Sequence, residues 1–206
     1  MSTSTSTPRV LRYRLRWRVV DIVTASVLGV ASAVIFWLWN IGHNGPVTLL
    51  APLAPGIQGL LDGPWLFAGV LGALVIRKPG AALYTELLAA VLSALAGNQW
   101  GGFATLMSGL VQGLGAELVF ALFLYRRWSW PVAMLAGVGA ALGGGIYNLV
   151  VWYAGSGPEF VRNYLICTMI SGAVIAGLGA WLITRGLAAA GVLERFASGR
   201  GARQRV

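Results

Sequence analysis

Long apolar runs alternate with short polar or basic connections along most of the 206-residue chain. A helix that crosses a membrane needs about 20 predominantly apolar residues. Six segments come near this length: 19–39, 59–76, 81–97, 104–125, 131–153 and 164–187. The second and third are the shortest. The pattern predicts an all-α integral membrane protein with six transmembrane helices.

Basic residues collect on alternate connections between these segments. Fourteen of the 15 lie before the first segment, between the second and third, between the fourth and fifth, or at and after the end of the sixth. Only Arg162 falls on the other side. Because positive charge is retained in the cytoplasm, both termini are predicted to be cytoplasmic. An even number of spans requires the same.

The predicted organisation is a disordered basic tail at 1–15, a six-helix transmembrane domain at 16–193 and a basic cytoplasmic tail at 194–206. Hydrophobic residues make up 57% of the chain and charged residues 10%, against about 25% charged in an average soluble domain. This composition argues against a soluble enzyme. The net charge of +9 comes from basic residues in the connections and tails. It therefore does not require a nucleic-acid partner.

The chain lacks the residues that most intramembrane chemistry requires. The only lysine, Lys78, is followed by proline and glycine, so there is no P-loop of an ATPase. One histidine, His43, and one cysteine, Cys167, are too few for a metalloprotease or zinc site. We therefore expect no enzyme activity, no catalytic residue, no bound metal and no cofactor.

Two carboxylates lie deep inside predicted spans, where an ionisable group is costly unless it is paired or lines a cavity. They are Glu86 and Glu117, both about 10 Å from the cytoplasmic face at about 1.5 Å per residue. Gln112 lies near mid-depth on the same segment as Glu117. We expect these three residues to contact a ligand; a carboxyl bonded to a neighbouring helix is the alternative.

A second polar and aromatic group gathers toward the outer face. Its expected ligand contacts are Asn98, Trp100, Tyr147 and Asn148, with Trp39 and Trp65 as stacking partners. Aromatic faces with a few polar groups suit a planar heterocycle or a cation. Tryptophan and tyrosine also anchor helices at membrane interfaces, so any one ring can be an anchor instead.

The first segment carries small residues four apart at Ala25, Gly29 and Ala33. Such a stripe allows helices to pack backbone to backbone. The spacing fits docking on a partner membrane protein and packing within this chain equally well.

Five stretches together resemble a known family: residues 76–82, 86–90, 97–101, 111–117 and 171–177. Over about residues 16–193, the chain resembles the substrate-binding S components of energy-coupling-factor (ECF) vitamin transporters, of the YkoE type. The resemblance implies a multi-pass protein of the cell membrane that captures thiamine or its hydroxymethylpyrimidine precursor from outside.

The resemblance also implies partners: a transmembrane coupling (T) protein and two ATP-binding cassette ATPases, which fits the missing P-loop. In this family a small-residue stripe on the first helix docks on the coupling protein, which strengthens that reading of Ala25, Gly29 and Ala33. The proline-containing connection 40–57 matches a lid over the site. The alternative is a self-sufficient secondary transporter or channel for a small cation or heterocycle, working without an ATPase.

Overall fold

The computed structural model describes residues 15–194, 196, 198 and 199. Of the predicted tails, 1–15 and 194–206, the structure describes only residues 15, 194, 196, 198 and 199. The described residues form helices and turns and no strand, so the prediction of an all-α protein is confirmed.

The elements follow one another in the order α1 (Val19–Gly42), α2 (Asn44–Leu50), the 3-10 helices η1 (Ile57–Leu61) and η2 (Gly63–Trp65), α3 (Phe67–Ile76), α4 (Ala81–Leu95), α5 (Gly102–Leu122), α6 (Trp130–Val151), α7 (Pro158–Ser171), the π-helix η3 (Gly172–Gly179) and α8 (Ala180–Ala189).

Within the described part of the chain, four helices are long and apolar enough to cross a membrane. They are α1, α5, α6 and the continuous 32-residue helix Pro158–Ala189 formed by α7, η3 and α8. The second and third predicted spans are shorter: α3 has ten residues and α4 has 15. Fifteen helical residues reach only about 22 Å. The count of six spans therefore stays a prediction.

The predicted span 59–76 is broken near its start. Pro64 lies in the first turn of η2 and has no backbone N–H to continue a helix. The Ser171 hydroxyl on α7 forms hydrogen bonds with two backbone groups at this break. It accepts from the Gly63 N–H at 2.9 Å and donates to the Leu60 carbonyl at 2.6 Å. The result is an irregular η1–η2 segment, held against α7, in place of the first half of a helix.

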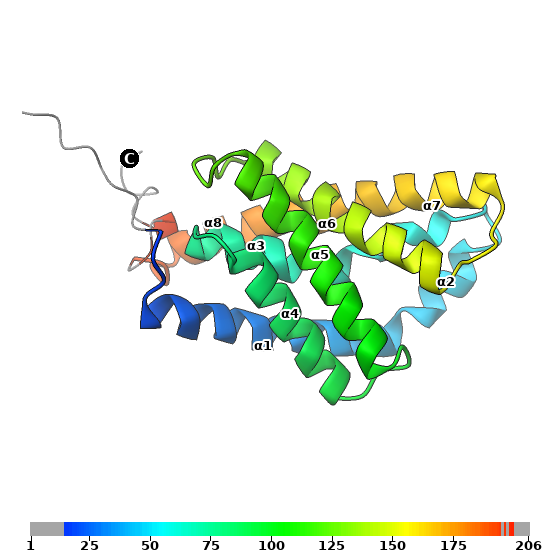
Figure 1. Ribbon diagram of the computed structural model, residues 1–206, viewed down its shortest axis with the longest axis horizontal. Helices are drawn as coiled ribbons and strands as arrows, with labels where there is room; N and C mark the ends of the chain where they lie inside the picture. The colour runs from blue at the N-terminus through cyan, green and yellow to red at the C-terminus, as the bar shows by residue number, and fades with distance from the viewer. Residues whose placement is uncertain (1–14, 195, 197, 200–206) are drawn as a thin grey trace, which may run out of the picture.

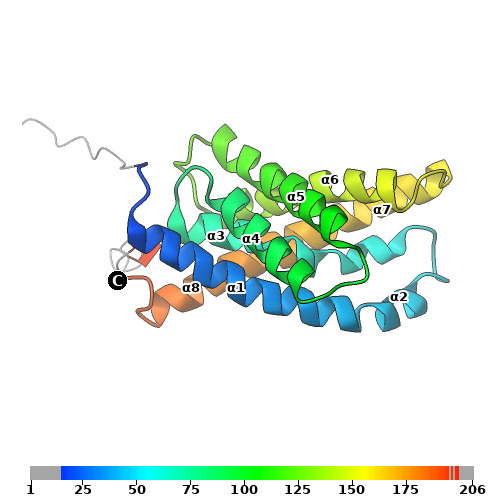
Figure 2. The ribbon, with the colours of Figure 1, turned by 60° about the horizontal axis from the view of Figure 1, so that its bottom comes forward.

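The helix α3 lies at the centre of the bundle (Figure 1, Figure 2). All ten of its residues are buried, as expected for a helix that is apolar on every side. The helices α1, α4, α5, α6 and α8 all contact it. The helix α1 and the continuous helix of α7, η3 and α8 run along the long axis of the molecule, and α4 and α5 cross them obliquely (Figure 1).

The small-residue stripe of α1 is buried within the chain. Ala25 is 0% exposed and Ala33 is 6% exposed. A Cβ atom placed on Gly29 would lie 2.9 Å from the Leu88 Cδ2 atom of α4. The stripe therefore packs α1 on α4 within this chain, and its docking on a partner membrane protein stays a prediction.

Both described ends of the chain lie at one end of the bundle, on the left of Figure 1, which we call the basic end. There Asp21 is fully buried and pairs with Arg18 at 2.9 Å and with Lys78. Lys78 also donates to the Arg16 carbonyl, and Trp17 Nε1 donates to the Pro79 carbonyl at 2.9 Å. These bonds join the segment before α1 to the α3–α4 connection.

Candidate functional site

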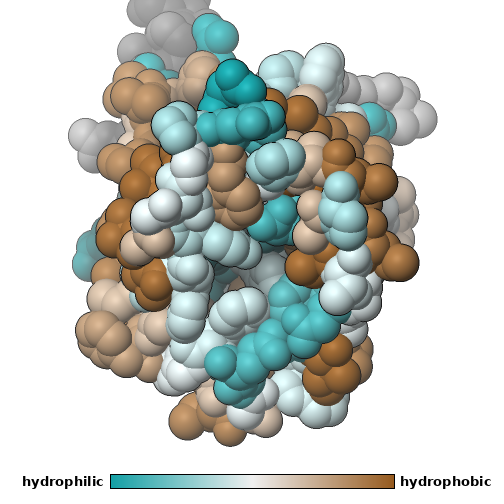
Figure 3. Space-filling view, turned by 90° about the vertical axis from the view of Figure 1, so that its right-hand side faces the viewer, coloured by the Kyte–Doolittle hydropathy of each residue, from teal (hydrophilic) through white to brown (hydrophobic). Residues whose placement is uncertain are grey.

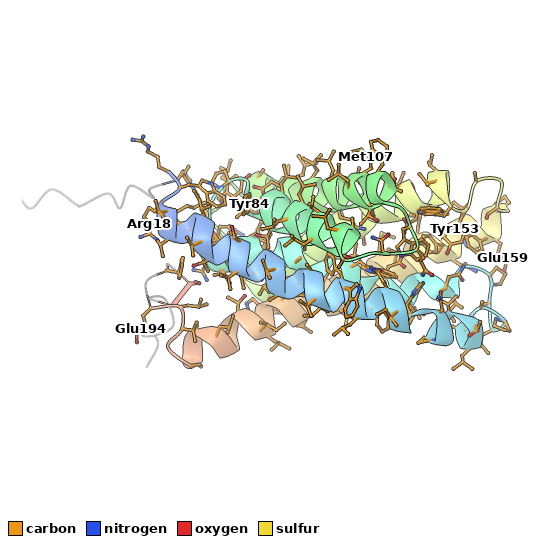
Figure 4. All side chains as sticks on the ribbon, turned by 90° about the horizontal axis from the view of Figure 1, so that it is seen from below. Arg18, Tyr84, Met107, Tyr153, Glu159 and Glu194 are labelled. Atoms are coloured by element: carbon orange, nitrogen blue, oxygen red, sulfur yellow. The ribbon has the colours of Figure 1, made fainter. Side chains whose placement is uncertain are left out.

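The opposite end of the bundle, which we call the cavity end, carries a cavity of about 100 Å³. The ends of α1 and α7, together with η1, η2, α2, α4, α5 and α6, supply its walls. Figure 3 looks directly at this end and shows a hollow among polar and weakly hydrophobic residues. In Figure 4, Tyr153 and Glu159 lie at the cavity end, far from Arg18 and Glu194 at the basic end.

Aromatic rings form one wall of the cavity. The centroid of Trp100 lies 6.2 Å from that of Trp65 and 5.5 Å from that of Trp152. His43 lies against Trp65 and Trp100, at 5.0 and 5.4 Å. The indole N–H of Trp65 donates to Asn40 Oδ1 at 2.8 Å, and this bond fixes the orientation of the ring. The wall offers several aromatic surfaces to a ligand.

A carboxylate faces the cavity from the break between η1 and η2. Asp62 Oδ2 accepts hydrogen bonds from the Tyr164 hydroxyl at 2.6 Å and from Thr168 Oγ1 at 3.0 Å. Asn148 Nδ2 in turn donates to the Tyr164 hydroxyl at 2.9 Å. Two helices, α6 and α7, thus position this carboxylate.

Glycines allow the η1–η2 segment to lie directly on α7. A Cβ atom on Gly59 would stand 2.6 Å from Thr168 Oγ1 and from the Tyr164 carbonyl oxygen. Gly56 has a φ of 82°, in the left-handed region that favours glycine. This close approach brings Asp62 within reach of the hydroxyl groups of α7.

Amide side chains complete the inner part of the cavity. Asn40 Nδ2 donates to Ser93 Oγ at 3.1 Å, and Gln112 Nε2 donates to Ser108 Oγ at 2.8 Å. All four residues line the cavity. They supply donors and acceptors of the kind that a heterocycle with ring nitrogens can use.

His43 is 6% exposed and also lines the cavity. Burial lowers its pKa, so the ring is neutral at pH 7. Its Nδ1 atom is buried and has no hydrogen-bond partner among the described residues. The ring therefore contributes a polar atom but no charge to this wall.

Four of the predicted contacts line the cavity: Trp65, Trp100, Gln112 and Asn148. The structure brings these residues together from η2, the α4–α5 connection, α5 and α6. Their role in ligand binding stays a prediction.

Three other predicted contacts support the walls from outside the lining. Asn98 donates to Thr105 Oγ1 at 3.0 Å and accepts from the Trp100 backbone N–H at 3.0 Å. Tyr147 donates to the Ala104 carbonyl at 3.1 Å, and Trp39 donates to the Leu61 carbonyl at 3.0 Å. Each bond holds a segment that itself reaches the cavity.

Glu86 and Glu117 do not line the cavity. Glu86 is 1% exposed, and its Oε2 atom accepts from the Gly69 backbone N–H at 2.6 Å. Glu117 accepts from the backbone N–H groups of Gly80 at 2.6 Å and Ala82 at 2.9 Å. These carboxylates are bound to neighbouring helices, the alternative that the sequence left open, and the shared cavity floor is not observed.

Several residues that line the cavity were not among the predicted ligand contacts: Asn40, His43, Asp62, Ser93 and Tyr164. Asp62 was detectable, because it is an acidic residue within an apolar segment and lies three positions before Trp65. Tyr164 and Ser93 gave no such signal, because the fold alone brings them to the cavity.

Comparison with known proteins gives three findings. Residues 20–143 match the family described as "ABC-type cobalt transport system, permease component". The chain is 40% identical over 185 residues to the protein YkoE of Bacillus subtilis (strain 168), which carries the name HMP/thiamine permease protein. This match covers 89% of this chain and 91% of that protein. A crystal structure of an S component of an ECF transporter superposes with a TM-score of 0.84 at 38% identity, over 92% of this chain and 95% of the other.

These relatives are transport proteins, and their match spans nearly the whole chain. Together with the apolar membrane-spanning helices, they identify a multi-pass protein of the cell membrane.

Proposed function

Because this chain belongs to the S components of ECF transporters, of the YkoE type, we propose that it is the substrate-capture subunit of an importer for thiamine or its hydroxymethylpyrimidine precursor. The observation that carries this proposal is the cavity, with its aromatic wall of Trp65, Trp100 and Trp152 and its polar inner part. Ligand pockets usually combine apolar and aromatic walls with a few placed polar groups.

The cavity suits an organic ring better than a metal ion. Although the matching family is described by cobalt transport, no group of three His, Cys, Asp or Glu side chains among the described residues could hold a metal ion. Cobalt sites draw on such side chains. The amides of Asn40, Gln112 and Asn148 and the aromatic faces match an aminopyrimidine instead.

We further propose that the chain works with a transmembrane coupling protein and two ATP-binding cassette ATPases, as the family implies. The cavity would then open to the outside and the basic end would lie in the cytoplasm. This orientation agrees with the positive-inside rule, because Arg77, Lys78, Arg126 and Arg127 lie in connections at the basic end.

The test is a titration of the purified protein in detergent with thiamine and with hydroxymethylpyrimidine, followed by tryptophan fluorescence. The chain has nine tryptophans, and several border the cavity. We expect saturable quenching by at least one of the two compounds and none by biotin, a carboxylate that lacks an aromatic ring.

Two variants show whether the quenched fluorescence comes from a tryptophan of the cavity. Trp100 lines the cavity, whereas Trp130 is exposed at the start of α6. Trp100→Phe is expected to lose much of the quenching, and Trp130→Phe is expected to retain it. If folded protein responds to neither compound, the proposed function is wrong.

A further inference from the structure

The connection between α5 and α6 lies at the basic end, at the upper left of Figure 1, and carries two adjacent arginines. Arg126 and Arg127 are exposed, and no hydrogen bond or ion pair joins either side chain to another described residue. Glu117, the acidic residue nearest to them in sequence, already accepts from four other donors. Within the described part of the chain, these two positive charges therefore have no counter-charge.

The turn that carries these arginines is held in a strained backbone conformation. Leu124 and Tyr125 have φ angles of 53° and 54°, in the left-handed region that favours glycine. The Tyr125 hydroxyl donates to Glu117 Oε1 at 2.8 Å, and Glu117 also accepts from the Gly80 N–H at 2.6 Å. The turn is thereby bonded to the start of α4, which fixes the backbone next to Arg126.

Apolar side chains border the arginines on both sides along the chain. Leu122 and Leu124 precede them, Trp130 follows them, and all three are exposed. In a membrane-spanning protein, exposed apolar side chains face lipid, and tryptophan concentrates at the depth of the headgroups. Arg77 adds a third positive charge to this corner, because its guanidinium lies 5.8 Å from the ring centroid of Trp128. The connection thus combines positive charge with an apolar surface that faces lipid.

This combination matches one class of ligand, a phospholipid whose headgroup carries a net negative charge. Arginine binds phosphate oxygens through parallel N–H donors, and basic sites between membrane helices bind anionic headgroups. A phosphocholine headgroup fits less well, because its ammonium group would meet positive charge and no unengaged acidic side chain of the described connection. An acidic protein surface would use the arginines but would leave the lipid-facing apolar residues without a role.

We propose that the α5–α6 connection binds the headgroup of an anionic phospholipid, with Arg126 and Arg127 on the phosphate. The exposed side chains of Leu122, Leu124 and Trp130 would lie against the acyl chains. In the predicted orientation this lipid belongs to the cytoplasmic leaflet. None of these residues lines the cavity, so the inference does not depend on the proposed function.

The test measures the binding of phosphatidylglycerol and phosphatidylcholine, with identical acyl chains, to the full chain by native mass spectrometry. No ligand of the cavity is added. We expect the wild type to bind phosphatidylglycerol about tenfold more tightly than phosphatidylcholine, because two arginines attract the net charge. Arg126→Gln/Arg127→Gln should reduce this preference to less than about threefold. Arg126→Lys/Arg127→Lys keeps both charges and should retain most of it.

Arg162→Gln is the matched control, because Arg162 is an exposed arginine on α7, close to the cavity end. It should keep the full preference. The single variants Arg126→Gln and Arg127→Gln should each lose part of the preference, so the test does not depend on the folding of the double variant. A preference that survives in these variants would overturn the inference. Equal binding of the two lipids by the wild type would also overturn it, and would leave an acidic protein surface as the partner of the arginines.

Glycerol 3-phosphate separates a lipid site from a site for free phosphate. It carries the phosphate group without the acyl chains, so at matched concentration it should not displace phosphatidylglycerol. Full displacement would overturn the assignment of a lipid and would make a free phosphate the ligand.

Discussion

At the residue scale, Asn40 links three elements in the inner part of the cavity. Its amide donates to Ser93 on α4, and its carbonyl oxygen accepts from Trp65 on η2. We expect Asn40→Ala to lower the free energy of unfolding by about 1–3 kcal/mol, because two buried groups lose their partner. Thiamine affinity should fall as well, since the Trp65 ring is no longer held in place.

The matched control for this prediction is Asn44→Ala. Asn44 and its partner Gln99 are both exposed, and their bond of 3.3 Å is long. Removing the Asn44 side chain should change the free energy of unfolding by less than about 0.5 kcal/mol. Unfolding in mixed detergent micelles and a thiamine titration measure both effects. Equal behaviour of the two variants would show that Asn40 does not support the wall.

The sequence identified the kinds of residue in the site better than their positions. Trp65, Trp100, Gln112 and Asn148 could be selected because polar and aromatic residues within apolar segments are unusual. Depth alone suggested Glu86 and Glu117, but depth does not show which face of a helix points to a cavity. Backbone N–H groups at the starts of other helices donate to one oxygen of Glu86 and to both oxygens of Glu117, and that pairing depends on packing.

At the scale of elements, Glu117 caps the start of α4 from a different helix. Its oxygens accept from the N–H groups of Gly80, Ala82 and Leu83 and from the Tyr125 hydroxyl. The first N–H groups of a helix have no partner within the helix. We expect Glu117→Ala to destabilise the protein by about 2 kcal/mol or more.

The thiamine affinity of the folded Glu117→Ala protein should stay unchanged, because Glu117 lies outside the cavity lining. Glu159→Ala removes an exposed carboxylate and serves as the control for stability. The melting temperature and a titration separate the two roles. Loss of thiamine binding in Glu117→Ala that keeps its melting temperature would make Glu117 a ligand contact after all.

Glycine sets the distance between α5 and α6. A Cβ atom on Gly115 would lie 2.1 Å from the Gly139 carbonyl oxygen, a backbone atom that cannot move unless the helices separate. Gly115→Ala is therefore expected to cost about 1–3 kcal/mol of stability, as overpacking does.

Gly186 on α8 provides the opposite case, because a Cβ atom there meets nothing within 4 Å. Gly186→Ala should stabilise the helix by up to about 1 kcal/mol. Melting temperatures of the two variants should therefore shift in opposite directions. A stabilised Gly115→Ala protein would contradict the close approach of α5 and α6.

Helix boundaries were predictable wherever a segment is long and uniformly apolar, as in α1, α5 and α6. The break at 62–64 was not, although Pro64 and Gly63 are visible in the sequence. What makes the break stable is Ser171, more than 100 positions away, which bonds both sides of it. Interactions at this sequence distance leave no periodic trace in the chain.

At the scale of the whole molecule, the predicted orientation places the α6–α7 connection outside and the α5–α6 connection inside the cell. In a Cys167→Ser background, Ala154→Cys and Ser129→Cys put single thiols at exposed positions in these connections. An impermeant maleimide should label Ala154→Cys in intact cells. Ser129→Cys should react only after the membrane is permeabilised, and the reverse result would invert the predicted topology.

The ion cluster at the basic end has a practical consequence for the whole chain. Lys78 carries the only lysine amine in the chain, is 8% exposed, and is engaged by Asp21 and the Arg16 carbonyl. An amine must be accessible to react with an activated ester, and here the amine is buried against the Asp21 carboxylate and the Arg16 carbonyl. The rate at which Lys78 is acylated therefore measures how often the segment before α1 detaches from the bundle.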